Sequence, residues 1–313
     1  MSMKAIQIHE FGGPEVLKYE EAPRPTPAPD EILIKVYATG VNPVDWKIRE
    51  GVRKEPATTR FPLIPGWDVS GVVEETGPGV ENFKKGDEVY SRPDISKNGT
   101  YAEYVAVKAD QVGRKPRSID HVNAAGVPLA GLTAWQGLFD HGKLRAGEKV
   151  LILGASGGVG SFAVQFAKWK GAYVIATSSE RNVDFLKKLG ADEVLDYKKE
   201  NFEEKLHDID LVFDTVGAQT QARSIQVLKK GGRLITTVKP ENEREAKDKN
   251  IRQEGYMTQS LPSELDEIAN LIDSGKIKPV VSKVFQLDQA AEAQELSKEG
   301  HVRGKIVLRV INE

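Results

Sequence analysis

Residues 146–168 read AGEKVLILGASGGVGSFAVQFAK, and the pattern changes twice along this segment. Residues 150–153 are purely apolar, as is typical of a parallel strand that is buried on both faces. Glycine-rich residues follow, and after them apolar side chains recur at helical spacing between Val159 and Ala167. A strand, a glycine turn and a helix in this order predict a dinucleotide site.

The glycine turn suits a dinucleotide for two physical reasons. Small residues let the backbone approach a pyrophosphate, and the N-terminus of the next helix offers free N–H groups and a partial positive charge. The alternative is an ordinary tight turn in which the glycines serve packing alone. The cofactor contacts predicted in this segment are Ala155, Ser156, Gly157, Gly158, Val159 and Gly160.

Composition places the chain among globular proteins and excludes several kinds of chemistry. The 313 residues carry 44 basic and 46 acidic side chains, a net charge of -2, so we expect no nucleic-acid or membrane partner. There is no apolar stretch long enough to span a bilayer and no signal-peptide core at the start, which favours a cytoplasmic protein. The chain has no cysteine, which excludes disulfides, thiolate chemistry and cysteine-ligated zinc.

The chain divides into three segments. Residues 1–121 show short alternating runs and turn residues, typical of a small, irregular β-barrel-like domain. Residues 122–262 alternate strands and helices, which predicts a doubly wound parallel sheet. Residues 263–313 add an amphipathic helix, a strand, a second helix and a last strand. The strands expected in the middle segment are 150–153, 173–177, 193–195, 211–213 and 233–238.

The end of the second of these strands predicts which nicotinamide cofactor binds. An acidic residue there binds the ribose 2′-hydroxyl of NAD, whereas a basic one accepts the 2′-phosphate of NADP. Ser178 fills this position, and Glu180 lies one step into the next helix, behind a Ser179 N-cap. Ser178, Ser179 and Arg181 can supply hydroxyls and a charged fork to a phosphate, so we expect NADPH. The alternative is a capped surface helix with an incidental arginine.

Several motifs resemble the medium-chain dehydrogenase/reductase superfamily, and within it the zinc-independent quinone oxidoreductase, or zeta-crystallin-like, branch. The resemblance covers nearly the full length and rests on residues 147–168, 40–51, 65–71, 99–104 and 130–134. It implies an α/β fold: a Rossmann doubly wound parallel sheet inserted in a GroES-like, β-barrel-type catalytic domain, which the N-terminal and C-terminal segments build together. It also implies a homodimer.

The same resemblance predicts that no metal is bound. Zinc alcohol dehydrogenases of the superfamily carry a Cys and a His where this chain has Asn42 and Trp67, and a Glu at Asp68. One carboxylate cannot build a tetrahedral site, so alcohol oxidation is disfavoured. The best-known quinone reductases tend to carry a Tyr at Lys47, and the segment 42–47 looks closer to plant-type enone reductases.

The resemblance also implies cofactor contacts outside the glycine turn. Thr133 and the loop after residues 233–238 would flank the nicotinamide, and the adenosine end would meet residues 197 and 216–217. Structural alternatives are a helix residue for Thr133, a turn for Gly217 and a solvated strand flank for Lys305. The contacts implied in this way are Thr133, Tyr197, Val216, Gly217, Val238, Gly304 and Lys305.

At the reacting end, hydride transfer to the β-carbon of a conjugated carbonyl leaves an enolate oxygen that needs hydrogen-bond donors. The matched segment places Lys47 and Asn42 nearest, although Lys47 could instead anchor the cofactor. Asp45 is a candidate to orient Lys47, with a purely structural turn as the alternative. Trp67 would supply an apolar wall and Tyr90 a substrate contact, although strand tyrosines more often pack.

The sequence therefore predicts a reductase that transfers hydride from NADPH to quinones or α,β-unsaturated carbonyl compounds. Two alternatives remain open at this point. One is an enoyl-thioester reductase, and the other is a non-catalytic NADPH-binding protein like the lens crystallins of this branch.

Overall fold

The computed structural model describes residues 1–52, 60–94, 98–217 and 219–311. The chain forms two compact units, the first built from Met1–Leu129 with Ser260–Glu313 and the second from Ala130–Gln259. The expected boundaries after residues 121 and 262 differ from these, because α2 (His121–Ala125) packs on the first unit's strands and Ser260 bonds to the backbone of Arg92.

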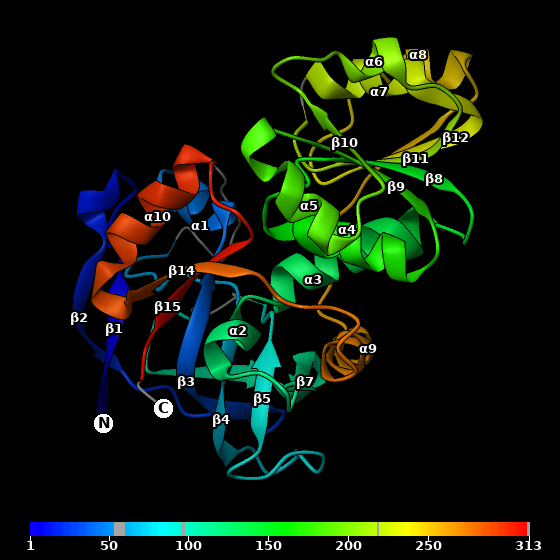
Figure 1. Cartoon of the computed structure of the whole chain (residues 1–313). Coiled ribbons are helices and arrows are strands. Elements are labelled where there is room, and N and C mark those ends of the chain that lie inside the picture. The colour runs from blue at the N-terminus through cyan, green and yellow to red at the C-terminus, as the bar shows by residue number, and fades with distance from the viewer. Residues whose placement is uncertain (53–59, 95–97, 218, 312–313) are drawn as a thin grey trace. The chain divides into compact units, whose positions relative to one another are not determined.

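The first unit contains a mixed sheet and a separate hairpin (Figure 1). Among the described residues the sheet has the order β14-β15-β3-β4-β5-β7, with β6 also paired to β3. Its strands are β3 (Glu31–Val41), β4 (Val69–Thr76), β5 (Glu88–Ser91), β6 (Tyr104–Lys108), β7 (Val112–Arg114), β14 (Val281–Gln286) and β15 (Lys305–Arg309). The hairpin joins β1 (Ser2–Gln7) and β2 (Lys18–Pro23).

The last strand of the chain completes this sheet. β15 pairs antiparallel with β3, with Ile306 opposite Val41 and Leu308 opposite Thr39. In Figure 1, β15 accordingly lies beside β3, although their residues come from opposite ends of the chain. The first unit is therefore discontinuous in sequence.

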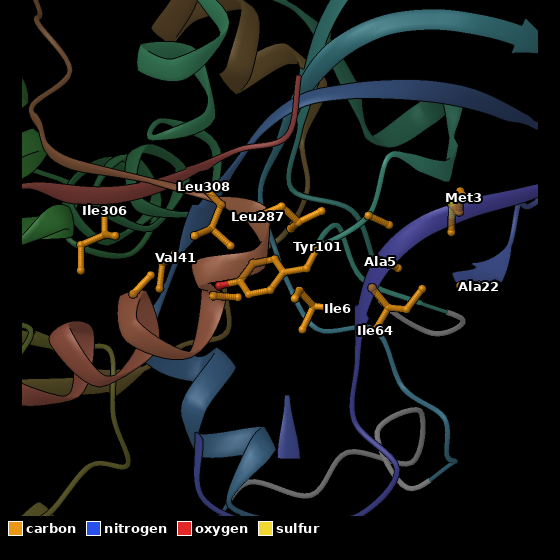
Figure 2. Close-up of a cluster of buried hydrophobic side chains, with 13 residues drawn as sticks. Met3, Ala5, Ile6, Ala22, Val41, Ile64, Tyr101, Leu287, Ile306 and Leu308 are labelled. Atoms are coloured by element: carbon orange, nitrogen blue, oxygen red, sulfur yellow. The ribbon is translucent and has the colours of Figure 1, made fainter. Parts of the chain in front are cut away.

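Side chains from both ends of the chain share one hydrophobic core, shown in Figure 2. Met3 and Ile6 of β1 pack with Ile306 and Leu308 of β15, and the ring of Tyr101 lies in the same cluster. Full burial of such an apolar side chain contributes about 1.5–3 kcal/mol. Release of the C-terminal segment would therefore expose a large part of this core.

The helices of the first unit include one that the sequence did not predict. They are α1 (Pro43–Arg49), α2, α9 (Pro262–Asp273) and α10 (Ala290–Glu299), with short 3-10 helices at Pro14–Val16, Ala109–Gln111 and Leu287–Gln289. The expectation of only strands and turns in residues 1–121 is wrong at α1. Asn42 is its N-cap, Pro43 is its first residue, and the Asn42 N–H donates to Asp45 Oδ2 at 2.8 Å.

The second unit confirms the predicted doubly wound sheet. Among the described residues all its strands run parallel in the order β10-β9-β8-β11-β12-β13. They are β8 (Lys149–Leu153), β9 (Tyr173–Ser178), β10 (Glu193–Asp196), β11 (Ile209–Asp214), β12 (Leu228–Thr236) and β13 (Arg252–Gly255). The polar edge strand β13 was not predicted, and β12 begins at Leu228, earlier than the expected strand start at residue 233.

Helices cover both faces of this parallel sheet (Figure 1). α4 and α5 pack on one face, and α6, α7 and α8 lie on the other. These helices are α4 (Gly158–Trp169), α5 (Val183–Leu189), α6 (Phe202–Lys205), α7 (Gln219–Val227) and α8 (Glu243–Asp248). α3 (Pro128–Trp135) runs into a π-helix at Gln136–His141, and a 3-10 helix spans Glu180–Asn182. None of the helices in the described part of the chain is long and apolar enough to cross a membrane.

A buried arginine joins α1 to α10. Arg49 is 0% exposed, and its guanidinium donates to Gln294 Oε1 at 3.1 Å, Glu295 Oε1 at 2.8 Å and Glu50 Oε1 at 2.8 Å. A buried charge needs such partners because its desolvation is otherwise uncompensated. The C-terminal segment is therefore fastened to the N-terminal segment by charge as well as by apolar packing.

We predict that Arg49→Met lowers the free energy of unfolding by about 3 kcal/mol, near the lower end for a broken buried pair, because the partly exposed Glu295 can be rehydrated. Urea unfolding of both proteins measures this difference. Lys85→Met is the control, since Lys85 pairs with Glu74 while its side chain is 71% exposed, and it should cost less than about 1 kcal/mol. Equal decreases in the free energy of unfolding in the two variants would show that the buried Arg49 pairs stabilise the protein no more than an exposed pair does.

Candidate functional site

The glycine turn after β8 has two kinds of glycine. A Cβ on Gly160 would lie 2.3 Å from the Gly154 carbonyl oxygen, so Gly160 is required for α4 to approach the turn. A Cβ on Gly157 would meet only the Gly154 oxygen, at 3.5 Å, so Gly157 borders open space. Packing alone therefore explains why residue 160 is a glycine, but it does not explain why residue 157 is one.

The N-terminus of α4 faces this open turn. Gly157 is its N-cap, and no side chain of the described residues caps it. The N–H groups of Gly158, Val159 and Gly160 are the first three of the helix and lack intrahelical acceptors. Free N–H groups beside a glycine that leaves room for a ligand fit the pyrophosphate of a dinucleotide.

At the end of β9, Ser178 contacts Ser156 and Tyr197. Ser178 Oγ donates to Ser156 Oγ at 3.2 Å, and the backbone N–H of Tyr197 donates to the Ser178 carbonyl at 3.2 Å. The carboxylate of Glu180 forms an exposed ion pair with Lys199, whose Nζ lies 2.6 Å away. The acidic residue nearest the strand end is thus engaged elsewhere, while Arg181 lies exposed on the following turn.

The end of β11 is organised by a carboxylate that sequence reasoning missed. Asp214 is 0% exposed and accepts the N–H groups of Val216 at 2.8 Å and Gly217 at 3.0 Å. Gly217 has φ +83°, and a Cβ on it would lie 2.5 Å from Val238 Cγ2. The structure therefore brings Val216, Gly217 and Val238 together, and an acidic residue directly after an apolar strand was the available signal for Asp214.

Thr133 is held by the segment that follows β13. Its Oγ1 lies 2.8 Å from Thr258 Oγ1, and the hydroxyl of Tyr256 donates to its carbonyl oxygen. These contacts lie within the second unit and fix the position of Thr133. Its predicted contact with the nicotinamide stays a prediction.

In the first unit, Asn42 and Lys305 meet inside the protein. Lys305 Nζ donates to the Val41 carbonyl at 2.9 Å and to Asn42 Oδ1, and it lies 3.4 Å from Asp68 Oδ2. Asn42 Nδ2 donates to the same carboxylate oxygen at 2.8 Å. Two predictions are thereby corrected: the Asn42 amide donates to Asp68 rather than toward a substrate, and the Lys305 ammonium is buried rather than presented to a cofactor.

Asp45 is a buried carboxyl group that caps α1. Its Oδ2 accepts the Asn42 N–H and, at 2.9 Å, the hydroxyl of Tyr101. Burial raises the pKa of Asp45 to about 7, and these two hydrogen bonds counteract only part of that effect. The structural alternative for Asp45 is therefore the better one, because its described contacts serve the helix start.

Lys47, Trp67 and Tyr90 were also predicted to face the substrate. The predictions for Lys47 and Trp67 stay predictions, whereas that for Tyr90 does not hold. Lys47 is half-buried, with Nζ 5.5 Å from the centroid of the Trp46 ring. Trp67 is 7% exposed and packs with Ile8 and Leu63. The prediction that Tyr90 contacts the substrate is wrong, because it is 0% exposed and its hydroxyl donates to the Leu265 carbonyl.

Gly304 also has a structural role. Its φ is +61°, and a Cβ on it would lie 2.2 Å from the Val280 carbonyl oxygen. Only glycine fits this backbone conformation and this close approach. This turn lets β15 start beside β14, and the predicted cofactor contact at Gly304 stays a prediction.

Metal-binding side chains do not gather in the described residues. No group of three or more His, Cys, Asp or Glu side chains there could hold a metal ion. The predicted site of the first unit instead contains the amide of Asn42, the indole of Trp67, the carboxylate of Asp68 and the ammonium of Lys305.

Comparisons with known proteins agree with this fold and identify the family. Residues 28–117 match the family described as alcohol dehydrogenase GroES-like domain, and residues 189–308 match the one described as zinc-binding dehydrogenase. The bovine mitochondrial NAD(P)H oxidoreductase RTN4IP1 is 36% identical over 99% of this chain and 89% of its own length. The chloroplastic NADPH-dependent alkenal/one oxidoreductase of Arabidopsis thaliana is 36% identical, over 98% and 79%.

A solved structure has the same fold. The quinone oxidoreductase from Coxiella burnetii superposes with a TM-score of 0.93 at 37% identity, covering 99% of this chain and 100% of that one. Fold and site together define an oxidoreductase that uses a nicotinamide cofactor. The chain belongs to the medium-chain dehydrogenase/reductase superfamily, as a quinone-oxidoreductase-like member.

The two kinds of glycine in the turn give a matched pair of variants. We predict that Gly157→Ala weakens dinucleotide binding at least about tenfold, or ~1.4 kcal/mol, and lowers stability by less than about 1 kcal/mol. Gly160→Ala should lower stability by about 1–3 kcal/mol, because its Cβ collides with the backbone of the turn. Titration calorimetry and thermal unfolding measure the two effects. Unchanged binding in Gly157→Ala would leave the turn without a ligand role.

Proposed function

We propose that this protein transfers hydride from NADPH to quinones or α,β-unsaturated carbonyl compounds without the help of a metal ion. The observation that carries the proposal is the combination of a dinucleotide-binding turn with a first unit whose zinc-ligand positions hold Asn42 and Trp67. The names of the relatives, which include an alkenal/one oxidoreductase and a quinone oxidoreductase, support the same reaction class.

The choice of NADPH over NADH rests on the end of β9. Ser156 offers a half-buried hydroxyl group there, the buried Ser178 hydroxyl donates to it, and Arg181 adds a guanidinium. A carboxylate at this place would repel a 2′-phosphate, but Glu180 is paired with Lys199. The local charge therefore favours a phosphorylated ribose.

The bound nicotinamide supplies the hydride, and the protein supplies binding and a donor for the carbonyl oxygen that becomes negative. The amide of Asn42 is committed to Asp68, which leaves Lys47 as the donor among the two proposed residues. Its ammonium stabilises the enolate oxygen of an enone, or the phenolate oxygen of a quinol, until a proton arrives from water. Trp67 forms an apolar side to this region.

We also propose that the chain acts as a homodimer. β13 lies at the edge of the parallel sheet, where the described residues pair it only with β12. An edge strand with unpaired backbone groups is a ready surface for pairing with a second copy.

We predict that the purified protein oxidises NADPH when an enone or a quinone is present, and that Lys47→Met lowers kcat for an enone about 100- to 1000-fold at unchanged NADPH affinity. The quinone reaction should suffer less, because a reduced quinone is intrinsically stable. Absorbance at the NADPH band follows both reactions, with Lys85→Met as the control. An NADPH affinity that falls while kcat at saturation survives would make Lys47 a cofactor anchor. Absence of turnover with every acceptor would favour a non-catalytic NADPH-binding protein.

The cofactor choice has its own test. Arg181→Ala should raise the Kd for NADPH about tenfold to a hundredfold, since a hydrogen bond to a charged group contributes about 1.5–3 kcal/mol, and should leave the Kd for NADH nearly unchanged. Lys188→Ala removes an exposed positive charge from the neighbouring helix and should change neither value. A wild-type protein that already prefers NADH would contradict the role of Arg181.

A further inference from the structure

Lys305 stands at the start of β15, and strand pairing carries it to the end of β3. The pair Ile306–Val41 is the end of the antiparallel register, so the preceding lysine reaches the corner where β3 turns into α1. Lys305 is 5% exposed, and its ammonium faces the Val41 carbonyl, Asn42 Oδ1 and Asp68 Oδ2. These acceptors match the three N–H donors of a lysine.

Asp68 is the counter-charge, and it is equally enclosed. It is 0% exposed, its Oδ1 accepts the Leu129 N–H at 2.6 Å, and its Oδ2 accepts from Asn42 Nδ2. Gly40 makes room for this carboxylate, because a Cβ there would lie 2.5 Å from Asp68 Oδ2. The residues around the pair thus leave room for one buried ammonium next to one buried carboxylate.

The pair determines how the Asn42 amide is turned. Its oxygen faces the Lys305 ammonium and its NH₂ group faces Asp68, so a flipped amide would place like groups together. Asn42 caps the helix that carries Lys47, and Asp68 directly follows Trp67. Both segments that carry the proposed substrate-facing side chains are therefore attached to the same ammonium.

We infer that Lys305 is a positioning residue of the reductase: an internal cation, supplied by the C-terminal segment, that fixes Asn42 and Asp68 and through them the segments of Lys47 and Trp67. This inference rests on the proposed function for its catalytic consequence. It replaces the expectation that Lys305 touches the cofactor. Asn42 stands where zinc alcohol dehydrogenases carry a zinc ligand, and its partner here is the Lys305 ammonium.

The test compares Lys305→Met, the double variant Lys305→Met with Asp68→Asn, and the control Lys283→Met on the exposed face of β14. The single variant leaves a buried carboxylate without its cation, so its melting temperature should fall. The double variant removes that charge and should regain most of the lost stability, so it carries the test even if the single variant fails to fold. In the double variant kcat should stay about 100-fold low, because the amide and the α1 corner remain misplaced, while the Kd for NADPH stays unchanged.

A second readout does not depend on turnover. Backbone hydrogen exchange of residues 43–49 should become faster in the double variant than in the wild type, while exchange in α9 stays the same. A wild type that turns over no acceptor overturns the proposed function, whereas exchange still decides whether Lys305 positions α1. The inference itself is overturned if the double variant regains wild-type kcat and exchange, or if its NADPH affinity falls while kcat at saturation is kept.

Discussion

The pairing of β15 with β3 is the contact on which the first unit depends. It brings residues 306–309 of the chain against residues 38–41, and everything between them that belongs to the second unit is inserted into this one domain. The pairing buries Ile306 and Leu308 against the N-terminal hairpin, and it places Lys305 beside Asn42. Without it, the core would be open and the buried carboxylate of Asp68 would have no cation.

A buried ion pair is an expensive way to stabilise a protein, because both charges lose their hydration. Well-packed apolar residues often stabilise the same space as well or better. The Lys305–Asp68 pair is therefore better explained by the geometry that it imposes on Asn42 and on the start of α1 than by its contribution to stability. Arg49 and Asp45 belong to the same helix, and their bonds to α10 and to the Asn42 N–H hold both ends of α1 in place.

Local patterns in the sequence were sufficient for much of the second unit. The apolar run at 150–153 and the spacing of glycines predicted β8, the turn and α4, because these features depend on neighbours in the chain. The strand β13 escaped prediction because its four residues, RQEG, are polar and only the neighbouring strand defines it. α1 could have been found from Asn42 and Pro43, which are N-cap and first-turn residues.

The candidate site of the first unit was harder to predict because its contacts link residues far apart in the chain. Nothing near Lys305 or Asn42 in the sequence indicates that they bond across 263 positions. A tyrosine in a strand can either pack in the core or contact a substrate. Only the hydrogen bond from Tyr90 to the Leu265 carbonyl shows that this one packs. The family resemblance suggested site positions along the chain, while the contacts of side chains such as Asn42, Tyr90 and Lys305 required the tertiary structure.

The central proposal is that this nicotinamide-dependent reductase works without a metal ion. The most direct measurement is the zinc content of the purified protein by plasma mass spectrometry, on the same sample whose NADPH-dependent turnover is determined. The account predicts far less than one zinc ion per chain at full turnover. One zinc ion per chain, with turnover lost on its removal and regained on its return, would contradict it.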